Sequence, residues 1–340
     1  MASFTKTANG WRVQISIKGQ RDSATHATKA QAAAWAAQRE TELRNQVATG
    51  VIAGRTFEDA CRRYEIDVSR HKRGHRWEAL RLSALCDFVM DSQRLGDMLL
   101  SDMSSDVIGR WRDMRMRGTP EVKPVSGSTV NRILNLWSHV LTTAAKEWKW
   151  IVESPTKDVR RPKESAHRDR RPTADEIERI CLYCNFNDEP ISKKMQAVAV
   201  CYLFAIETAM RQGEICGLLP SHISGAVAHL PMTKNGSKRD VPLSKRALEL
   251  ISYLPVQSDE EPESPVFMLT ADSLSTLFRK VCAACCIEDL TFHDSRHEAI
   301  TRLAKKLNVL DLARMVGHKD LRMLQVYYNE SAADMAARLD

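Results

Sequence analysis

Apolar and polar side chains alternate along the first eighteen residues, on both sides of an Asn9-Gly10 pair. Alternation with a period of two is typical of a strand with one buried face, and an Asn-Gly pair between two such runs predicts a β-hairpin. A turn over residues 18–21 is followed by a third short strand over 22–26. Thr28 then caps an alanine-rich helix over 29–47. We expect residues 1–50 to form a small sheet-plus-helix module.

From residue 56 to residue 155 the apolar positions recur at helical spacing, in four successive segments. Thr56 opens the first segment, and Glu58 and Asp59 lie in its first turn, where the helix dipole stabilises negative charge. The fourth segment, over 128–148, has a long apolar stripe made by Val130, Ile133, Leu134, Trp137, Val140, Leu141 and Ala144. Four amphipathic helices in about a hundred residues predict a compact helical bundle.

A further domain begins at Thr173, which forms a capping box with Glu176. A largely apolar helix over 194–209 leads to Arg211, and residues 227–231 and 239–243 predict a hairpin with Lys234 at its exposed end. Helices over 245–254 and 273–286 flank an acidic loop. The pattern therefore predicts a mainly α fold with small β elements, divided into a module over 1–50, a helical bundle over 56–155, a connector over 156–172 and a mixed α/β domain over 173–340.

Composition narrows the class of protein. A chain of 340 residues is long enough for two or three domains, each with its own core. The net charge is +7, yet acidic residues are plentiful, which favours a folded protein with local basic surfaces and is compatible with nucleic acid binding. The sequence has neither a signal peptide nor an apolar run long enough for a membrane span, so we expect a cytoplasmic protein with no membrane partner.

The nine cysteines lack the pattern of a secreted disulfide framework. Two groups, Cys181-x-x-Cys184 and Cys282-x-x-Cys285-Cys286, have spacings that a four-thiolate zinc site would use. Nearly a hundred residues separate them, and no glycine-rich knuckle surrounds either group. The alternative, which we favour, is that these cysteines are small apolar side chains on amphipathic helices. We expect no metal site and no cofactor.

Basic side chains are concentrated at a bend over residues 70–76 and in the connector. A charged face is usually only solvated surface, whereas a basic, extended connector stiffened by proline can follow a phosphate backbone. On the second interpretation the candidate DNA contacts in these two segments are Arg70, Lys72, Arg73, Arg76, Arg160, Arg161, Lys163, Arg170 and Arg171.

Residues suited to phosphoryl transfer are grouped in the second half of the chain: Arg211 with Glu214 three positions later, His293-Asp294-Ser295-Arg296, Gly317-His318, and Tyr327 nine positions after His318. Guanidinium groups bind phosphate oxygens through paired hydrogen bonds. A protonated tyrosine is a poor nucleophile, with an ordinary pKa of about 10. Close to two arginines and a histidine its phenolate can form and attack phosphorus. The set predicts covalent phosphoryl transfer through tyrosine.

These residues resemble the signature of the tyrosine recombinase (phage integrase) family, R…K…H-x-x-R…H…Y, and they occur in the same order with similar spacing. The resemblance implies that Tyr327 is the nucleophile, with Tyr328 as the alternative. It also implies roles for six further residues: phosphate binding by Arg211 and Arg296, orientation of the network by Glu214, protonation of the leaving 5′ oxygen by Lys234, proton transfer by His293 and a hydrogen bond to phosphate from His318. Lys238 and Arg239 lie close to Lys234 in the sequence, and we expect them to contact backbone phosphates.

The family resemblance further implies cleavage and rejoining of double-stranded DNA at attachment sites through a 3′-phosphotyrosyl link, without ATP or metal. Four protomers act together in the family, and accessory DNA-bending or directionality proteins are possible partners. The resemblance implies a protein of the bacterial cytoplasm, which is associated with the nucleoid when it is bound to DNA. The first module resembles the arm-binding domains of phage integrases, and its alternative role is a stabilising appendage. The tail over 329–340 would dock on a neighbouring protomer or on its own domain.

Three rival functions stay open at this stage. The stretches around Arg211, over 227–231 and over 239–244 also resemble shufflon-type DNA invertases, which share the chemistry but not the outcome. The N-terminal module favours an integrase over an invertase. An architectural DNA-binding protein without catalysis would have no need of Tyr327. A type IB topoisomerase shares the tyrosine chemistry, but the arm-like N-terminal module and the expected docking of the tail on a neighbouring protomer favour recombination.

Overall fold

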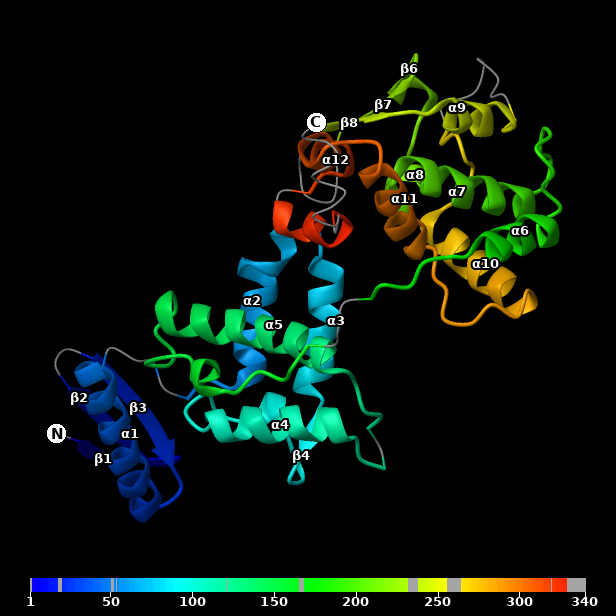
Figure 1. The fold of residues 1–340 in the computed structure, drawn as a ribbon. Helices are drawn as coiled ribbons and strands as arrows, with labels where there is room; N and C mark the ends of the chain where they lie inside the picture. The colour runs from blue at the N-terminus through cyan, green and yellow to red at the C-terminus, as the bar shows by residue number, and fades with distance from the viewer. Residues whose placement is uncertain are drawn as a thin grey trace. The chain divides into compact units, whose positions relative to one another are not determined.

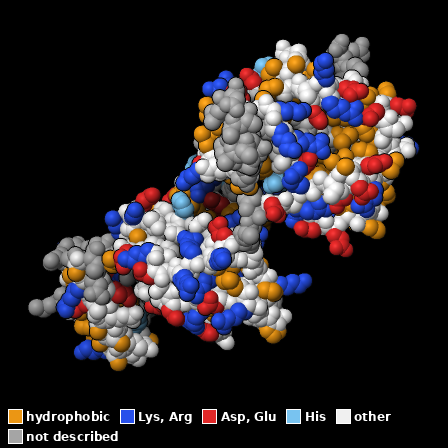
Figure 2. All heavy atoms as spheres, viewed as in Figure 1, with side chains coloured by type: hydrophobic (Ala, Val, Ile, Leu, Met, Phe, Trp, Pro, Cys, Tyr) orange, Lys and Arg blue, Asp and Glu red, His pale blue; other side chains and the backbone are white. Residues whose placement is uncertain are grey.

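The structure, a computed structural model of the chain, describes residues 2–17, 20–49, 52, 54–120, 122–164, 168–231, 238–255, 264–318 and 320–328. It divides into two compact units, residues 1–166 and 167–340 (Figure 1). Each unit is mostly helical and carries a small antiparallel sheet, so the predicted mainly α fold with small β elements is confirmed. On the face in Figure 2, basic and acidic side chains are intermixed over both units.

The first unit begins with the predicted sheet and helix. Strands β1 (Ser3–Thr7), β2 (Gly10–Ile17) and β3 (Gln20–His26) form an antiparallel sheet in that order, and α1 (Lys29–Thr49) follows. Gly10 has a φ of +125°, and a Cβ there would overlap the carbonyl of His26, so the hairpin requires glycine. The alternation predicted from the sequence buries Val13 and Ile15 of β2 against Ala32, Ala36 and Leu43 of α1.

The rest of the first unit is the predicted four-helix bundle, built from α2 (Phe57–Asp67), α3 (His75–Cys86), α4 (Ser105–Arg117) and α5 (Gly127–Lys146). A two-stranded hairpin, β4 (Val89–Met90) and β5 (Gln93–Arg94), lies between α3 and α4 in the chain. Thr56 caps α2 together with Asp59, as the sequence predicts. The core contains three aromatic rings in contact: Trp137 lies 5.2 Å from Trp111, in an edge-to-face arrangement, and 5.3 Å from Phe57, measured between ring centroids.

The second unit contains helices α6 (Ala174–Tyr183), α7 (Lys194–Thr208), α8 (Gln212–Cys216), α9 (Lys245–Ser252), α10 (Ala271–Ala284), α11 (Asp294–Ala304) and α12 (Val309–Val316). Its sheet has the order β6 (Ile223–Ser224), β7 (Val227–Leu230) and β8 (Arg239–Pro242). The antiparallel pairing of β7 with β8 confirms the predicted hairpin. The last described element is the 3-10 helix η5 (Leu321–Tyr327).

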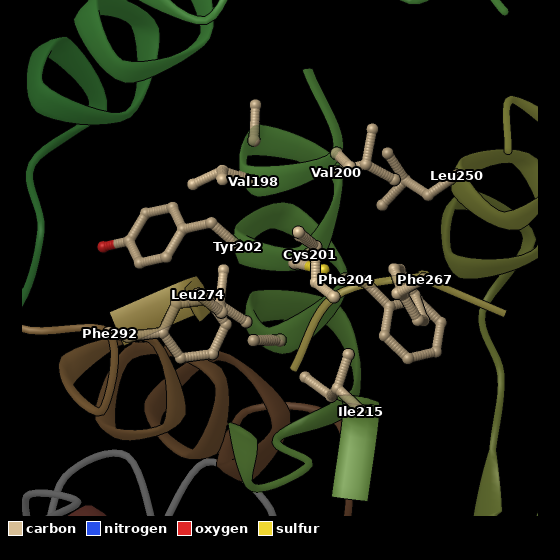
Figure 3. Close-up of a cluster of buried hydrophobic side chains, with 14 of the residues drawn as sticks. Val198, Val200, Cys201, Tyr202, Phe204, Ile215, Leu250, Phe267, Leu274 and Phe292 are labelled. Carbon is tan, nitrogen blue, oxygen red and sulfur yellow. The ribbon is translucent and has the colours of Figure 1, made fainter. Parts of the chain in front are cut away.

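Helix α7 forms the centre of this unit. Its side chains are apolar on nearly every face, and Val198, Cys201, Tyr202 and Phe204 are completely buried. They pack against Leu250 of α9, Phe267, Leu274 of α10 and Phe292 (Figure 3). A helix buried all round has no freedom to shift within its domain, because any displacement would open cavities in a close-packed core. The end of α7 is therefore a fixed point from which the following residues are positioned.

Four cysteines, Cys184, Cys201, Cys216 and Cys282, act as apolar side chains in this core. Cys184 and Cys282 are buried, and burial raises the pKa of the Cys184 thiol to about 12, so the thiol stays protonated. Among the described residues, no group of three or more His, Cys, Asp or Glu side chains is placed to hold a metal ion. Within the same residues, no helix has the length and apolar character needed to cross a membrane.

Candidate active site

A sharp turn after α7 places Arg211. The helix ends at Thr208, and Ala209 takes a left-handed conformation with a φ of +53°. Arg211 then caps α8, and its backbone N–H donates to Oε2 of Glu214 at 2.8 Å. The Glu214 side chain therefore satisfies a backbone donor that the helix start would leave unpaired. This local hydrogen bond fixes the backbone that carries the Arg211 side chain.

The Glu214 carboxylate also joins two guanidinium groups. Arg211 Nη1 donates to its Oε1 at 3.0 Å, while Arg239 binds both oxygens, at 2.8 Å through Nη1 and 2.6 Å through Nη2. The side chains of Glu214 and Arg239 are only 8% and 6% exposed, so this is not an ordinary surface ion pair. Burial alone would raise the pKa of Glu214, but the hydrogen bonds from Arg239 and Arg211 lower it, and the carboxylate is ionised.

The location of Arg239 differs from the sequence prediction. It was expected to contact backbone phosphates, yet its side chain lies inside the site, and its Nε also donates to the carbonyl of Met315 at 3.0 Å. Strand alternation is the signal that could have found it: Arg239 and Val241 share the inward face of β8, whereas Asp240 points to solvent. Lys238, the residue before β8, is exposed.

Arg296 of α11 is 4% exposed and is held by backbone carbonyls from two other elements. Its Nη1 donates to the carbonyl of Ala209, at the end of α7, and its Nη2 donates to the carbonyl of Val316 at 2.7 Å. Burial and the charges of Arg211 and Arg239 lower the pKa of Arg296 to about 9, which still leaves the guanidinium charged at neutral pH. Arg211 and Arg239 thus share one buried carboxylate, and Arg296 adds a third positive charge near it, an excess that suits an anionic ligand.

His318 lies beside Arg296. Gly317 ends α12 in a left-handed conformation, with a φ of +69°, and redirects the chain as predicted. Arg296 Nη2 lies 3.3 Å from His318 Nε2, and because arginine only donates, this ring nitrogen is the acceptor. Burial, followed by the charges of Arg296, Arg211 and Arg239, lowers the pKa of His318 to about 4. The ring is neutral at neutral pH and carries its proton on Nδ1, which has no hydrogen-bond partner among the described residues.

Tyr327 and Tyr328 differ in what their side chains contact. The Tyr328 hydroxyl donates to the carbonyl of Leu307 at 2.8 Å, which is a structural contact. Tyr327 is half-buried, and its ring lies 5.1 Å from that of His297, a residue that the sequence analysis left out of the site. Burial raises the pKa of Tyr327, and the charge of Arg296 only partly opposes this shift. The phenol is therefore protonated in the free protein, and its proton must leave as it reacts.

Two other expected site residues are His293 and Lys234. His293 precedes α11 and is exposed, although its carbonyl accepts the backbone N–H of Arg296 at 3.0 Å. Its side chain lies at the surface of the unit, whereas that of Arg296 is buried. Lys234 lies outside the described residues, in the segment that joins β7 to β8.

The expected DNA contacts fall into two groups. Most of these side chains are exposed: Arg70, Arg73, Arg76, Arg160, Arg161 and Lys163. Lys72 is half-buried and binds Glu78 at 3.0 Å and the Tyr64 hydroxyl at 2.7 Å. Arg170 pairs with Glu176, and Arg171 binds Glu298 at 2.7 Å. In the free protein these last two arginines hold carboxylates of their own unit.

The predicted connector over 156–172 is fastened at both ends. Within the first unit, Asn131 Nδ2 donates to the carbonyl of Pro162 at 3.0 Å, and Arg112 Nη1 donates to the carbonyl of Arg160 at 2.7 Å. Residues 168–172 are bound to the second unit instead, through the arginine pairs described above. The two units therefore divide inside the segment that was expected to be the basic, DNA-contacting connector.

Comparison with known proteins matches this arrangement to one family. The sequence profile of the phage integrase family covers residues 170–334. A shufflon-specific DNA recombinase of Escherichia coli is 36% identical over 82% of this chain and 70% of its own. Two putative integrase/recombinase proteins of Haemophilus influenzae are 34% and 35% identical, over 90% and 99% of this chain and 97% and 88% of theirs.

Solved structures share the fold. A lambda integrase dimer bound to a COC′ core site aligns over 96% of both chains, with a TM-score of 0.65 and 18% identity. The Tn1549 transposon integrase, in complex with circular intermediate DNA, aligns over 84% of this chain and 100% of its own, with a TM-score of 0.64 and 18% identity. Since relatives at least 34% identical extend over most of the chain, the protein belongs to the phage integrase family, the tyrosine recombinases that cleave and rejoin DNA.

Proposed function

We propose that this recombinase is an integrase that inserts and excises a mobile DNA element, with Tyr327 as its nucleophile. The observation that supports the assignment most directly is the cluster of Arg211, Arg296 and His318 next to the Tyr327 segment. It provides two guanidinium groups and a neutral imidazole for one phosphate, and a free phenol to attack it. The neighbouring Tyr328 hydroxyl is already bound to a backbone carbonyl.

In the proposed reaction the Tyr327 oxygen forms a bond to the scissile phosphorus and the bond to the 5′ oxygen breaks. The products are a 3′-phosphotyrosyl link and a free 5′ hydroxyl. Arg211 and Arg296 bind the non-bridging oxygens, and the phosphate takes over hydrogen bonds that Arg296 now gives to backbone carbonyls. His318 donates from its protonated ring nitrogen as negative charge builds up.

Two proton transfers complete the step. The proton of Tyr327 leaves with the help of His293, whose exposed position lets it exchange protons with solvent. Lys234 supplies a proton to the departing 5′ oxygen. Glu214 acts on the reaction indirectly, since it orients Arg211 through a hydrogen bond and through the backbone of α8. Attack by the 5′ hydroxyl of a partner strand then reverses the step without ATP.

We further infer that the first unit grips double-stranded DNA and that four protomers act together at paired attachment sites. Two structures of lambda integrase with this fold support the inference, one a dimer on a core site and the other a tetramer on a Holliday junction. In the first unit, exposed Arg70, Arg73 and Arg76 would bind the phosphate backbone. The sheet of β1, β2 and β3 would bind arm-type sites, and accessory DNA-bending proteins would act beside it.

A second candidate function is DNA inversion by the same chemistry, and the shufflon-specific recombinase at 36% identity favours it. The two functions differ in the products they form. Plasmids that carry two recombination sites in inverted orientation should be inverted efficiently by an invertase. An integrase should instead join sites on separate molecules, and this difference can be measured by restriction mapping of the products.

The experiment that tests the chemistry uses a nicked duplex, built on a site that the protein itself selects from a pool of random duplexes. Cleavage near the nick releases a short strand, which traps the covalent adduct. We expect an adduct in the presence of EDTA, the same adduct from Tyr328→Phe and none from Tyr327→Phe. Loss of the adduct in Tyr328→Phe alone would shift the nucleophile by one residue. No adduct on a bound site would favour an architectural DNA-binding protein.

A further inference from the structure

Helix α11 has two buried carboxylates on the side away from Arg296. Asp294 and Glu298 are one helical turn apart and are 2% and 5% exposed. Arg296 lies midway between them in the sequence, and a separation of two residues on a helix places it on roughly the opposite face. The helix therefore presents one face to the candidate active site and another to whatever holds these two acids.

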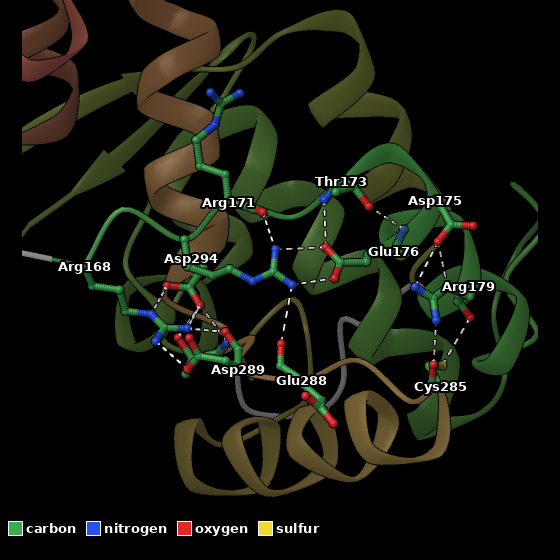
Figure 4. Close-up of polar contacts among 12 residues, drawn as sticks. Arg168, Arg171, Thr173, Asp175, Glu176, Arg179, Cys285, Glu288, Asp289 and Asp294 are labelled. Atoms are coloured by element: carbon green, nitrogen blue, oxygen red, sulfur yellow. Dashed lines mark hydrogen bonds and ion pairs between the residues drawn. The ribbon is translucent and has the colours of Figure 1, made fainter.

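The segment that holds them is the strap, which we define as residues 168–172. Arg168 forms a bidentate ion pair with Asp294: Nε donates to Oδ1 at 2.8 Å and Nη2 donates to Oδ2 at 2.8 Å (Figure 4). Its third nitrogen, Nη1, donates to Oδ1 of Asp289 at 2.7 Å. Asp294 also accepts the backbone N–H and the hydroxyl of Thr291, at 2.7 and 3.0 Å. The first turn of α11 is thus tied to the strap and to the preceding loop.

A second arginine repeats the contact one turn further along. Arg171 Nε donates to Oε2 of Glu298 at 2.7 Å, and Arg302 Nε donates to the other oxygen at 2.6 Å. Between the residues that make these two contacts, Arg170 pairs with Glu176 and fixes the strap to α6. All three arginines of the strap are therefore used in binding their own unit.

The Arg168 contact matters energetically because it stabilises the negative charge of the buried Asp294 carboxylate. Without the guanidinium, Asp294 would keep its hydrogen bonds from Thr291 but would be a buried charge with no cation in direct contact, which is strongly unfavourable. The helix start would have to shift or open to admit water. His293 immediately precedes this turn and Arg296 lies within it, so both would move with it.

We propose that Arg168 is a positioning residue of the recombinase, which holds the first turn of α11 so that His293 and Arg296 meet the scissile phosphate. The proposal rests on the function assigned above. It gives the end of the connector a role in catalysis, because the same few residues that enter the second unit also fix the helix that carries two of its site residues. Arg168 acts through Asp294 and does not touch the DNA.

The test compares Arg168→Ala with Arg168→Lys and Asp294→Asn, on the nicked duplex described above. Arg246→Ala is the matched control, because Arg246 also pairs with two carboxylates, Asp188 and Glu249, and is similarly exposed at 35% against 39%. The rate of adduct formation is measured at saturating duplex, and the Kd for the duplex is measured separately. Thermal unfolding shows how much of each protein is folded at the assay temperature.

We expect Arg168→Ala to slow adduct formation by about 10- to 100-fold, the loss typical of a small misplacement of reacting groups, with Kd changed less than about threefold. Asp294→Asn should slow it comparably. Lysine keeps the positive charge but cannot form the bidentate contact, so the rate for Arg168→Lys should lie between those of the wild type and Arg168→Ala. Arg246→Ala should react like the wild type. Equal rates for Arg168→Ala and Arg246→Ala, or a loss confined to Kd, would overturn the proposal.

A second substrate separates positioning from a general loss of folded structure. Replacement of one non-bridging oxygen of the scissile phosphate by a methyl group removes its negative charge and reduces the need for Arg296. If Arg168 positions Arg296 as well as His293, the deficit of Arg168→Ala should shrink by about threefold or more on this substrate, and the part that remains belongs to His293. An unchanged deficit would contradict the proposal. Failure of the wild type to form any adduct would instead count against the proposed function itself.

Discussion

Glu214 and Arg239, which stand 25 residues apart in the chain, form a two-pronged ion pair with N–O distances of 2.8 and 2.6 Å. The pair is almost completely buried, and Glu214 uses the same carboxylate to hold Arg211. Arg239 in addition binds the carbonyl of Met315, close to His318. The pair thus connects the start of α8, the strand after Lys234 and the end of α12, which are the three places that supply most of the site.

Replacement of Glu214 by glutamine should weaken both the fold and the reaction. Glutamine can still accept one hydrogen bond, but Arg211 and Arg239 lose their counterion, so the free energy of unfolding should fall by about 1–3 kcal/mol. Adduct formation should slow by about tenfold or more, because Arg211 is no longer oriented. Urea unfolding and the nicked-duplex assay measure the two effects. Unchanged values in both would contradict the role given to Glu214.

The Glu214 carboxylate should also make the stability of the protein depend on pH. The pKa of Glu214 is lowered in the folded protein from the ordinary value of 4.5, so its contribution to stability is present above that value and is lost as the pH falls through the lowered pKa. The stability difference between wild type and Glu214→Gln should therefore be constant above about pH 5 and shrink in more acidic solution. Urea unfolding of both proteins as a function of pH checks the sign.

Arg239 and Lys238 are neighbours with different expected roles. Arg239→Ala should reduce adduct formation by about tenfold or more at saturating DNA, because it leaves the Glu214 network incomplete. Lys238→Ala, at an exposed position, should leave that rate unchanged and weaken DNA binding slightly, with a smaller dependence on salt. Rates at saturating duplex and Kd values at several salt concentrations separate the two residues. The reverse pattern would restore Arg239 as a backbone contact.

His318 should titrate far below an ordinary histidine. Its pKa of about 4 follows from burial and from the three nearby arginines, and the ring should be neutral throughout the physiological range. Because the unfolded chain binds the proton more readily, stability should fall as the pH drops from about 6.5 to 4, and His318→Gln should remove this part of the dependence. An NMR titration, with the signal assigned through His318→Gln, measures the pKa directly. A midpoint near 6.5 would contradict the geometry.

Replacement of the two adjacent tyrosines should have different effects, one on the stability of the fold and the other on the reaction. Tyr328→Phe removes the hydrogen bond to the Leu307 carbonyl and should lower the free energy of unfolding by about 1 kcal/mol while adduct formation persists. Tyr327→Phe should abolish the adduct. Because burial raises the pKa of Tyr327, a spectroscopic pH titration should place the ionisation of this phenol above that of an ordinary tyrosine.

The sequence determined the elements and the chemistry of this protein. Alternation around Asn9-Gly10, helical periodicity in the bundle and the glycine before His318 depend on residues a few positions apart, and the structure has the predicted hairpin, helices and chain reversal. The order and spacing of Arg211, Arg296, His318 and Tyr327 were sufficient to indicate phosphoryl transfer through tyrosine. Local spacing fixes such features because it fixes which side chains share a face.

Only the tertiary structure decided which charges are partners. Arg168 and Asp294 are 126 residues apart, and Arg171 and Glu298 are 127 apart, so no local pattern distinguishes an arginine that holds a carboxylate from one that awaits a phosphate. The same holds for the pairing of Arg239 with Glu214, the contact of His297 with Tyr327 and the lowered pKa of His318. Each depends on burial and on the field of side chains brought together by folding, which are properties of the packed domain and not of neighbouring residues.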